Sequence, residues 1–212
     1  MKAFIYTGGC IVPENISERA GEGDLIIAAD SGYLNARLMG VSPSVAVGDF
    51  DSLAKDDQSF SSDTKVIRLP AEKDLSDTQA AVNIALERGA DEIVIIGGLD
   101  GRLDHTMANM LVVEELTKKG ITATITDGRN RVRFLSSSSV LILRENFKYL
   151  SIVPTVDTLK KVDVKGCKYP LKRATLLRSD PSFAISNEIV ENCAFVSIGR
   201  GSAYIIESND KK

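Results

Sequence analysis

Cysteine is scarce in this chain, and the three cysteines have no spacing that suggests a shared role. Cys10, Cys167 and Cys193 are odd in number and lie far apart, without the short spacing of a metal-binding motif. Neither a disulfide framework nor a cysteine-based metal site is therefore indicated. We expect all three cysteines to be reduced and buried, since free cysteine behaves as a small apolar residue.

Long apolar runs and an excess of positive charge are also missing. No run approaches the roughly 20 residues of a membrane-spanning helix, and no apolar signal region precedes the strand-like residues 3–6. We therefore expect a soluble, cytoplasmic protein with no membrane partner. A formal net charge of -3 and a pI near 5.3 argue against a general nucleic-acid binder, which normally has a basic surface.

Neither of the ordinary nucleotide-binding motifs is present. The chain has no Gly-Lys-Ser/Thr phosphate loop and no Gly-x-Gly-x-x-Gly after its first predicted strand. It also has no low-complexity tract and no internal repeat. A nucleotide site in this chain has to be sought in other residues.

Up to about residue 130, the sequence alternates regularly between strand-like and helix-like segments. Near-continuous apolar runs such as 93–96 are typical of strands covered on both faces, as in a parallel sheet. Alternation with helices predicts a doubly wound α/β domain with a mainly parallel sheet. The expected strands are 2–6, 24–29, 44–47, 64–69, 92–96 and 122–126, and the expected helices are about 33–39, 77–88 and 103–119.

The pattern changes near residue 130, where the helical periodicity fades. Short apolar or β-branched runs follow at close intervals, separated by Gly, Pro, Ser and Asn, which is typical of an antiparallel sandwich or barrel. We therefore predict two domains, an α/β domain over 1–129 and an all-β domain over 130–212. The expected strands of the second domain are 132–135, 140–143, 149–153, 158–164, 175–177, 188–196 and 202–206.

Acidic side chains follow the predicted parallel strands at their carboxyl ends. Asp49 and Asp51, in the stretch Val-Gly-Asp-Phe-Asp-Ser, lie two residues apart directly after the third strand. Because residues i and i+2 of an extended segment point the same way, both carboxylates can reach one Mg²⁺. Taken alone, the stretch is equally well explained as a polar turn with solvated acids. The other acids at this edge of the sheet are Asp30, Asp74, Asp77, Asp100 and Asp104.

Two of the acidic segments also have a purely structural explanation. Asp30 suits the N-cap of the helix that follows it, although a helix N-terminus equally suits a phosphate or a ribose. Residues 76–79 have the spacing of a capping box, with Asp77 in the first turn of the helix. Lys73 and Asp74 precede that cap and are not explained by it, whereas a lysine there can bind a polyphosphate.

The segment from Gly97 to His105, after the fifth strand, is rich in glycine and carries charges of both signs. Glycine lets a backbone approach a phosphate, and the guanidinium of Arg102 can form paired hydrogen bonds with one. Asp104 also suits the start of a helix, and a lone histidine such as His105 is more often a surface or core residue than a ligand. Helix caps and turns do not explain why all these groups share one edge, which favours a metal and polyphosphate site.

Taken in order, these segments resemble the thiamin pyrophosphokinase family over essentially the whole chain. Three positions depart from the family pattern: Ser76 replaces threonine, Gln79 replaces a frequent glutamate, and Asp100 stands where bacterial relatives usually carry glycine. None of these changes removes a residue on which the chemistry depends. The matching segments are Ala29-Asp30-Ser31-Gly32, Gly48-Asp49-Phe50-Asp51-Ser52, Lys73 to Asp77, Gly101-Arg102-Leu103-Asp104-His105, Lys168-Tyr169-Pro170-Leu171 and Ser186-Asn187-Glu188.

The resemblance implies transfer of a pyrophosphoryl group from ATP to the hydroxyethyl oxygen of thiamin, with release of AMP. It implies a first domain that binds ATP and Mg²⁺, a second domain that binds thiamin, and a homodimer with active sites between the subunits. It assigns the Mg²⁺ and the catalysis to Asp49, Asp51, Asp74 and Asp77 with Lys73, the ATP to Asp30, Ser52, Lys73, Arg102, Asp104 and His105, and the thiamin to Ser186 and Asn187.

Two other functions remain open at this point. One is a Mg²⁺-dependent phosphohydrolase with Asp49 or Asp51 as the nucleophile, although such enzymes carry their paired aspartates after the first strand and not the third. The other is a catalytically silent sensor of thiamin or a nucleotide, which would not need the full set of acids. Without the resemblance, Ser186 and Asn187 would be read as a turn between two strands.

Overall fold

The structure is a computed structural model of the 212-residue chain, and it describes residues 1–51, 60–70 and 74–210. The chain forms two compact units, Met1–Gly128 and Arg129–Lys212. Unit 1 thus ends one residue before the end of the predicted first domain. Within the described ranges, no helix has the length and apolar character needed to cross a membrane.

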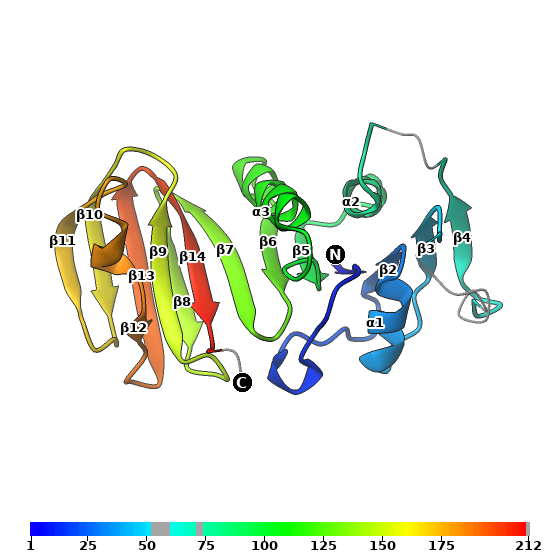
Figure 1. Ribbon diagram of the computed structural model, residues 1–212, viewed down its shortest axis with the longest axis horizontal. Coiled ribbons are helices and arrows are strands. Elements are labelled where there is room, and N and C mark those ends of the chain that lie inside the picture. The colour runs from blue at the N-terminus through cyan, green and yellow to red at the C-terminus, as the bar shows by residue number, and fades with distance from the viewer. Residues whose placement is uncertain (52–59, 71–73, 211–212) are drawn as a thin grey trace. The chain divides into compact units, whose positions relative to one another are not determined.

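Unit 1 contains a parallel sheet with the strand order β6-β5-β1-β2-β3-β4. Helix α1 lies on one face of this sheet, and α2 and α3 lie on the other (Figure 1). The strands are β1 (Lys2–Tyr6), β2 (Leu25–Ala29), β3 (Val45–Gly48), β4 (Lys65–Arg68), β5 (Glu92–Ile96) and β6 (Thr122–Thr126). The helices are η1 (Pro13–Asn15, a 3-10 turn), α1 (Gly32–Leu38), α2 (Asp77–Glu87) and α3 (Leu103–Lys118).

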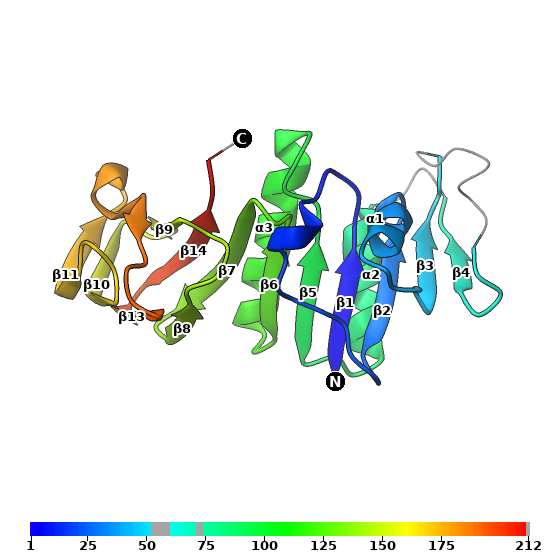
Figure 2. The same ribbon diagram turned by 90° about the horizontal axis from the view of Figure 1, so that it is seen from below.

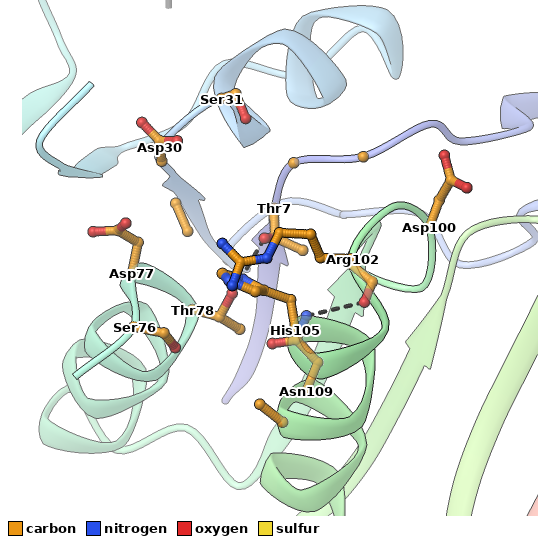
Figure 3. A pocket seen from close by; sticks show the side chains of 15 residues that line it. Thr7, Asp30, Ser31, Ser76, Asp77, Thr78, Asp100, Arg102, His105 and Asn109 are labelled. Atoms are coloured by element: carbon orange, nitrogen blue, oxygen red, sulfur yellow. Dashed lines mark hydrogen bonds between the residues drawn. The ribbon is translucent and has the colours of Figure 1, made fainter. Parts of the chain in front are cut away.

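Strand β1 comes first in the chain but lies inside the sheet, between β2 and β5 (Figure 2). The chain adds β2, β3 and β4 on one side of β1 and then returns to add β5 and β6 on the other. The strand order therefore reverses between β1 and β5, and open parallel sheets bind their ligands at such a point. The segments that follow these strands surround the region drawn in Figure 3.

The apolar runs of the sequence form the buried strands of unit 1. Residues Ala3 to Tyr6 of β1 and Ile93 to Ile96 of β5 are at most 2% exposed. Phe4 and Tyr6 pack with Ile16 and Ala36 on the face that carries α1. Both faces of the central strands are thus covered, which is the condition that a continuous apolar run predicts.

A capping box fixes the start of α2. The Ser76 hydroxyl accepts a hydrogen bond from the Gln79 backbone N–H at 3.2 Å, and the Ser76 N–H donates to Gln79 Oε1 at 3.0 Å. The structural explanation of residues 76–79 is therefore confirmed. The same cap brings Asp77 into the first turn of α2, where the helix dipole favours a carboxylate.

Unit 2 is an antiparallel sandwich. One sheet has the order β12-β9-β14-β7 and the other β11-β10-β13-β8, and apolar residues from both sheets form a single core. Together with the parallel sheet of unit 1, this arrangement confirms the predicted fold class. The strands are β7 (Asn130–Ser136), β8 (Ser139–Leu143), β9 (Tyr149–Pro154), β10 (Thr158–Lys165), β11 (Leu171–Leu177), β12 (Asn187–Glu188), β13 (Cys193–Arg200) and β14 (Ser202–Ser208), with a 3-10 turn η3 (Pro181–Ala184).

The prediction of one strand over 188–196 is wrong. Strand β12 ends at Glu188 and pairs with β9, whereas β13 begins at Cys193 and pairs with β8 and β10 in the other sheet. Between them, the N–H groups of Val190 and Glu191 donate to the carbonyl of Gly166. The apolar run looks continuous in the sequence because both of its halves face the same core.

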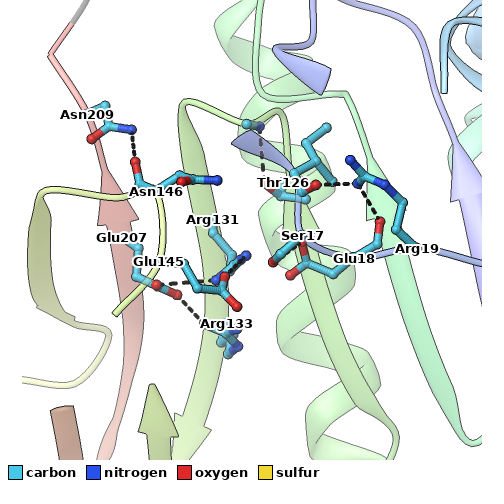
Figure 4. A network of polar contacts seen from close by, with 12 residues as sticks. Ser17, Glu18, Arg19, Thr126, Arg131, Arg133, Glu145, Asn146, Glu207 and Asn209 are labelled. Carbon is cyan, nitrogen blue, oxygen red and sulfur yellow. Dashed lines mark hydrogen bonds and ion pairs between the residues drawn. The ribbon is translucent and has the colours of Figure 1, made fainter. Parts of the chain in front are cut away.

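Charged side chains of unit 2 meet around the buried carboxylate of Glu207, which is 1% exposed (Figure 4). Arg131, which is 2% exposed, lies 3.4 Å from Glu207 and 2.6 Å from Glu145, and Arg133 also pairs with Glu207. The guanidinium of Arg131 lies 4.7 Å from the ring centroid of Phe147. Buried charges are tolerated when they are paired in this way, and removing one partner is costly.

We predict that Glu207→Gln lowers the free energy of unfolding by about 3 kcal/mol, because it leaves the buried Arg131 without this counter-charge. Urea denaturation followed by circular dichroism measures the change. The control is Lys148→Gln, which removes an exposed pair with Asp210 in the same unit and should have little effect. Equal effects of the two substitutions would contradict the conclusion that the buried ion pairs of Glu207 stabilise the protein.

Candidate active site

A pocket of about 320 Å³ lies in unit 1 at the carboxyl edge of the sheet. This volume is within the range typical of small-molecule sites. Asp30 and Asp77 lie on one side of the pocket, and the side chains of Arg102 and His105 extend toward its middle (Figure 3). Its lining comes from the end of β2, the loops after β1, β2 and β5, the start of α2 and the first two turns of α3. The lining residues are Thr7, Gly8, Gly9, Ala29, Asp30, Ser31, Ser76, Asp77, Thr78, Gly98, Asp100, Arg102, His105, Ala108 and Asn109.

Three carboxylates that follow β2 and β3 form a cluster. Ligand oxygens of Asp30, Asp49 and Asp51 all lie within 4.8 Å of one another. Asp30 belongs both to this cluster and to the lining of the pocket. An all-oxygen donor set of this kind suits Mg²⁺, which keeps further positions for water and phosphate oxygens.

The turn after β3 is shaped by a glycine and a buried aromatic ring. A side chain at Gly48 would place its Cβ 3.1 to 3.2 Å from backbone and Cβ atoms of Asp30, so glycine lets the two acidic turns approach closely without crowding. Phe50 is 0% exposed, has a φ of 60°, and packs edge-on against Phe60 at 5.0 Å between ring centroids. The burial of this ring offsets the roughly 1–3 kcal/mol that a left-handed non-glycine residue costs.

The same turn holds Asp49 and Asp51 near each other. The N–H of Asp51 donates to Asp49 Oδ1 at 3.1 Å, while the ring of Phe50 between them is buried in the unit. Asp30 also has a left-handed backbone, with a φ of 48°. Left-handed backbone is uncommon outside glycine, and strained residues of this kind are concentrated at functional sites.

Buried polar contacts join the segments that line the pocket. The hydroxyl groups of Thr7 and Thr78 lie 3.2 Å apart and link the loop after β1 to the first turn of α2. Asn109 of α3, which is 7% exposed, donates to the Gly98 carbonyl at 3.0 Å. The loops after β1 and β5 are therefore fixed by side chains on the helices around them.

Positive charge reaches the pocket from the start of α3. The guanidinium of Arg102 forms a paired contact with Asp104, with Nη2–Oδ2 at 2.6 Å and Nε–Oδ1 at 3.2 Å. These hydrogen bonds raise the pKa of Arg102 and lower the pKa of Asp104. Both groups are exposed, so a phosphate can compete with Asp104 for the guanidinium.

Some of the predicted site residues of unit 1 line this pocket and others do not. Asp30, Asp77, Arg102 and His105 line it, and Asp49 and Asp51 join it through the carboxylate cluster. Asp104 contacts Arg102, whereas Asp74 is exposed and belongs to neither the lining nor the cluster. Ser52 and Lys73 lie outside the described residues.

Unit 2 has a pocket of its own, about 190 Å³ in volume, whose lining includes Asn187 and the aromatic residues Tyr169 and Phe183. Asn187 Oδ1 accepts from the Tyr169 N–H at 3.0 Å, and its Nδ2 donates to the Tyr169 carbonyl at 2.8 Å. The neighbouring Ser186 has a φ of 58°, and its N–H donates to the Ser151 hydroxyl at 3.0 Å. Asn187 therefore fixes the backbone of Tyr169, a residue that is 61% exposed.

Several pocket residues were missed by the sequence reasoning. Thr7, Gly8 and Gly9 follow β1, the central strand, and the glycine pair at a strand end was a signal that could have found them. Asn109 and Thr78 lie on helix faces and have no comparable local signal. Nothing in the sequence alone singled out Phe183, because its role depends on the fold of η3 against β9 and β11.

The expectation that all three cysteines are buried is wrong. Cys167 is buried and Cys193 is half-buried, but Cys10 is exposed. Cys10 lies in the loop after β1, and its N–H donates to Asp100 Oδ2 at 3.4 Å. Its position at a loop beside the pocket, and not in the apolar core, explains the exposure.

Comparison with known proteins finds two family models along this chain. The thiamin pyrophosphokinase catalytic domain matches residues 18–125, and the thiamin pyrophosphokinase vitamin B1 binding domain matches residues 138–202. The thiamine pyrophosphokinase of Bacillus subtilis (strain 168) is 29% identical over 192 residues, which cover 89% of each chain. Thiamin pyrophosphokinase 1 of Caenorhabditis elegans is 28% identical over 174 residues, which cover 78% of this chain and 70% of that protein.

Solved structures show the same relationship. The crystal structure of thiamine pyrophosphokinase from Bacillus subtilis superposes with a TM-score of 0.86 at 25% identity, over 100% of both chains. Thiamin pyrophosphokinase from Candida albicans, at 16% identity, shares the fold with a TM-score of 0.73 over 98% of this chain and 89% of that one.

The exposure of Cys10 leads to a prediction about thiol reactivity. At pH 8 a disulfide reagent should modify Cys10 rapidly and Cys167 very slowly, because burial raises the pKa of the Cys167 thiol to about 11 and keeps it protonated. Reaction progress at each cysteine can be followed by peptide mass spectrometry. In Cys10→Ser the rapid phase should disappear, and its persistence would contradict the prediction.

Proposed function

Because the chain belongs to the thiamin pyrophosphokinase family, we propose that it transfers the pyrophosphoryl group of ATP to thiamin, forming thiamin diphosphate and AMP. The observation that carries this proposal is the cluster of Asp30, Asp49 and Asp51 beside a pocket at the reversal point of a parallel sheet. Such an edge suits a nucleotide and its metal ion. We also propose that the enzyme is cytoplasmic.

The carboxylate cluster is the proposed Mg²⁺ site. All its donors are carboxylate oxygens close enough to share one ion, which fits Mg²⁺ and not a metal that prefers nitrogen or sulfur ligands. When bound, Mg²⁺ would neutralise charge on the phosphates of ATP. We assign its direct ligands to Asp30, Asp49 and Asp51, with Asp77 at the pocket wall and Asp74 outside the set.

The remaining pocket residues would bind and orient ATP. Arg102 and His105 reach into the pocket from the start of α3, and the N-termini of α2 and α3 both favour negative charge there. Ser52 and Lys73 are proposed to contact ATP from sequence alone. Attack by the thiamin hydroxyl falls on the β-phosphorus, so alignment of the two substrates supplies most of the catalysis.

The pocket of unit 2 is the proposed thiamin site. The exposed ring of Tyr169 offers an apolar face on which the flat aminopyrimidine can stack, with Phe183 on the same pocket. Ser186, at the end of the turn, is proposed to hydrogen-bond the aminopyrimidine directly. Asn187 is proposed to act mainly by holding Tyr169, because its amide already bonds both backbone groups of that residue.

A product assay tests the proposed function. Purified protein is incubated with ATP, MgCl₂ and thiamin, and the products are separated by chromatography. AMP and thiamin diphosphate in equal amounts are expected, and EDTA should abolish both. Formation of ADP or free phosphate would favour a phosphohydrolase, and binding without any product would favour a sensor.

Asp51→Asn should lower turnover roughly 100-fold or more, because one metal-binding charge is lost from a site that works by charge stabilisation. The control is Asp63→Asn, which removes the charge of an exposed aspartate before β4 and should leave turnover unchanged. Circular dichroism should show both variants folded. Turnover of Asp51→Asn at the wild-type rate would show that Asp51 is not a metal ligand.

We also propose that the enzyme is a homodimer, in which unit 1 of one subunit and unit 2 of the other form each active site. The Asp51→Asn and Tyr169→Ala variants would then damage different halves of a site. Mixed dimers of the two variants contain one site with both halves intact.

A random mixture of the two variants should therefore recover about a quarter of the wild-type activity, because half of the dimers are mixed and each has one intact site. Co-expression with two different tags allows the mixed dimer to be purified from its parents, and the purified mixed dimer should have about half of the wild-type activity, since one of its two sites is intact. If each site lay within a single subunit, the mixed dimer would be no more active than the average of its parents.

A further inference from the structure

In the loop that follows β1, the backbone carbonyls of Thr7, Gly8 and Gly9 all accept hydrogen bonds from within unit 1. The side-chain nitrogen of Asn35 donates to the carbonyls of Thr7 at 2.7 Å and Gly9 at 2.9 Å. The carbonyl between them, that of Gly8, accepts from the backbone N–H of Gly98 at 2.9 Å. All three acceptors of this pocket-lining loop are thus bound within unit 1.

The donors of the same loop are only partly used. The Thr7 N–H donates to the Ile96 carbonyl, whereas those of Gly8 and Gly9 have no hydrogen-bond partner among the residues that the structure describes. Backbone N–H groups are strong hydrogen-bond donors, and Gly8 and Gly9 both line the pocket, so a ligand there can accept from them. The backbone groups of Thr7, Gly8 and Gly9 that remain available to a ligand are therefore hydrogen-bond donors only. Such a set of donors suits an anion.

A carboxylate of the chain itself already contacts the end of this loop. Asp100 Oδ2 accepts from the Cys10 N–H at 3.4 Å, and Asp100 lines the same pocket. The loop therefore already binds an anionic group through its backbone. Gly9, with a φ of 96°, has the left-handed backbone found in loops whose successive N–H groups converge on an anion.

Asn35 reaches the loop because α1 begins against β1. A side chain at Gly32 would place its Cβ 2.0 Å from the Tyr6 carbonyl oxygen, so only glycine allows this approach. Asn35 follows in the same short helix and is 8% exposed. Its amide nitrogen carries two hydrogens, and each one is bonded to a carbonyl of the loop.

We propose that the loop from Thr7 to Cys10 binds phosphate oxygens through the backbone N–H groups of Gly8 and Gly9, and that Asn35 is the positioning residue that keeps its carbonyls turned away. The inference rests on the proposed function only in identifying the anion as the polyphosphate of ATP. Asn35 itself contacts the loop and not the phosphate.

The first test replaces the amide of Asn35 by a carboxylate of the same shape. Asn35→Asp cannot donate two hydrogen bonds and repels the carbonyls of Thr7 and Gly9. Calorimetric titration with inorganic tripolyphosphate in the presence of MgCl₂ should show affinity about tenfold or more weaker than wild type. The reason is that loss of one hydrogen bond from a loop N–H to the charged phosphate costs about that factor.

The matched control is Thr64→Val. The Thr64 side chain is buried to a similar degree, at 8% exposed, and donates to the Pro43 carbonyl at 2.7 Å, outside the pocket. This variant loses a buried hydrogen bond to a backbone carbonyl, as Asn35→Asp does, but should bind tripolyphosphate like the wild type. Wild-type affinity in a folded Asn35→Asp, or equal losses in both variants, would overturn the role of Asn35.

The second test observes the loop directly and needs no variant. Thr7-Gly8 is the only Thr-Gly pair in the chain, so labelling threonine carbonyls with ¹³C and glycine nitrogens with ¹⁵N isolates the amide signal of Gly8. Tripolyphosphate should shift this signal with the same saturation as the calorimetric titration. An unchanged Gly8 signal at saturation, or no binding by the wild type, would overturn the inference even if Asn35→Asp does not fold.

These outcomes are separable from the fate of the proposed function. If the protein makes thiamin diphosphate while its Gly8 signal stays unchanged, the proposed function is supported and the proposed loop site is rejected. If the Gly8 signal shifts with tripolyphosphate but no thiamin diphosphate is made, the loop site is supported and the proposed function is rejected.

Discussion

Parallel pairing of β1 with β2 on one side and β5 on the other is the interaction on which the rest of unit 1 depends. Because the pairs are parallel, every strand ends at the same edge, and the loops that follow come together there. Residues as distant in sequence as Thr7, Asp30 and Arg102 line one pocket for this reason. An antiparallel neighbour for β1 would send one of these loops to the opposite edge.

Bringing several carboxylates to one edge opposes folding, because like charges repel and left-handed turns are strained. Asp30 and Phe50 have φ values of 48° and 60°, and both lie in the acidic turns. Burial of the central strands and of the Phe50 ring stabilises the fold and offsets this strain. A metal ion at the cluster would relieve the repulsion, so the site is expected to be more stable with Mg²⁺ than without it.

The sequence predicted the alternation of strands and helices well, because apolar periodicity is local and β1 and β5 are buried on both faces. It also predicted that the acids share an edge, since that follows from a parallel sheet alone. It could not predict that Asp30, and not Asp74, joins Asp49 and Asp51, because this depends on a left-handed turn and on Gly48. The break after β12 was equally hidden, because it depends on which sheet each half joins.

The two units divide the proposed chemistry according to what each kind of sheet can supply. A parallel sheet collects helix N-termini, glycine loops and acids at one edge, and these groups bind polyphosphate and metal. An antiparallel sandwich supplies a rigid apolar pocket, and in unit 2 Asn187 holds the backbone of Tyr169, which lines that pocket. Thiamin carries a positive charge on its thiazolium ring, so the excess negative charge of the acidic cluster would attract the acceptor substrate as well as the metal. The same carboxylates would then favour both the metal ion and the acceptor substrate, although the flat ring of thiamin would be recognised at the proposed site in the other unit.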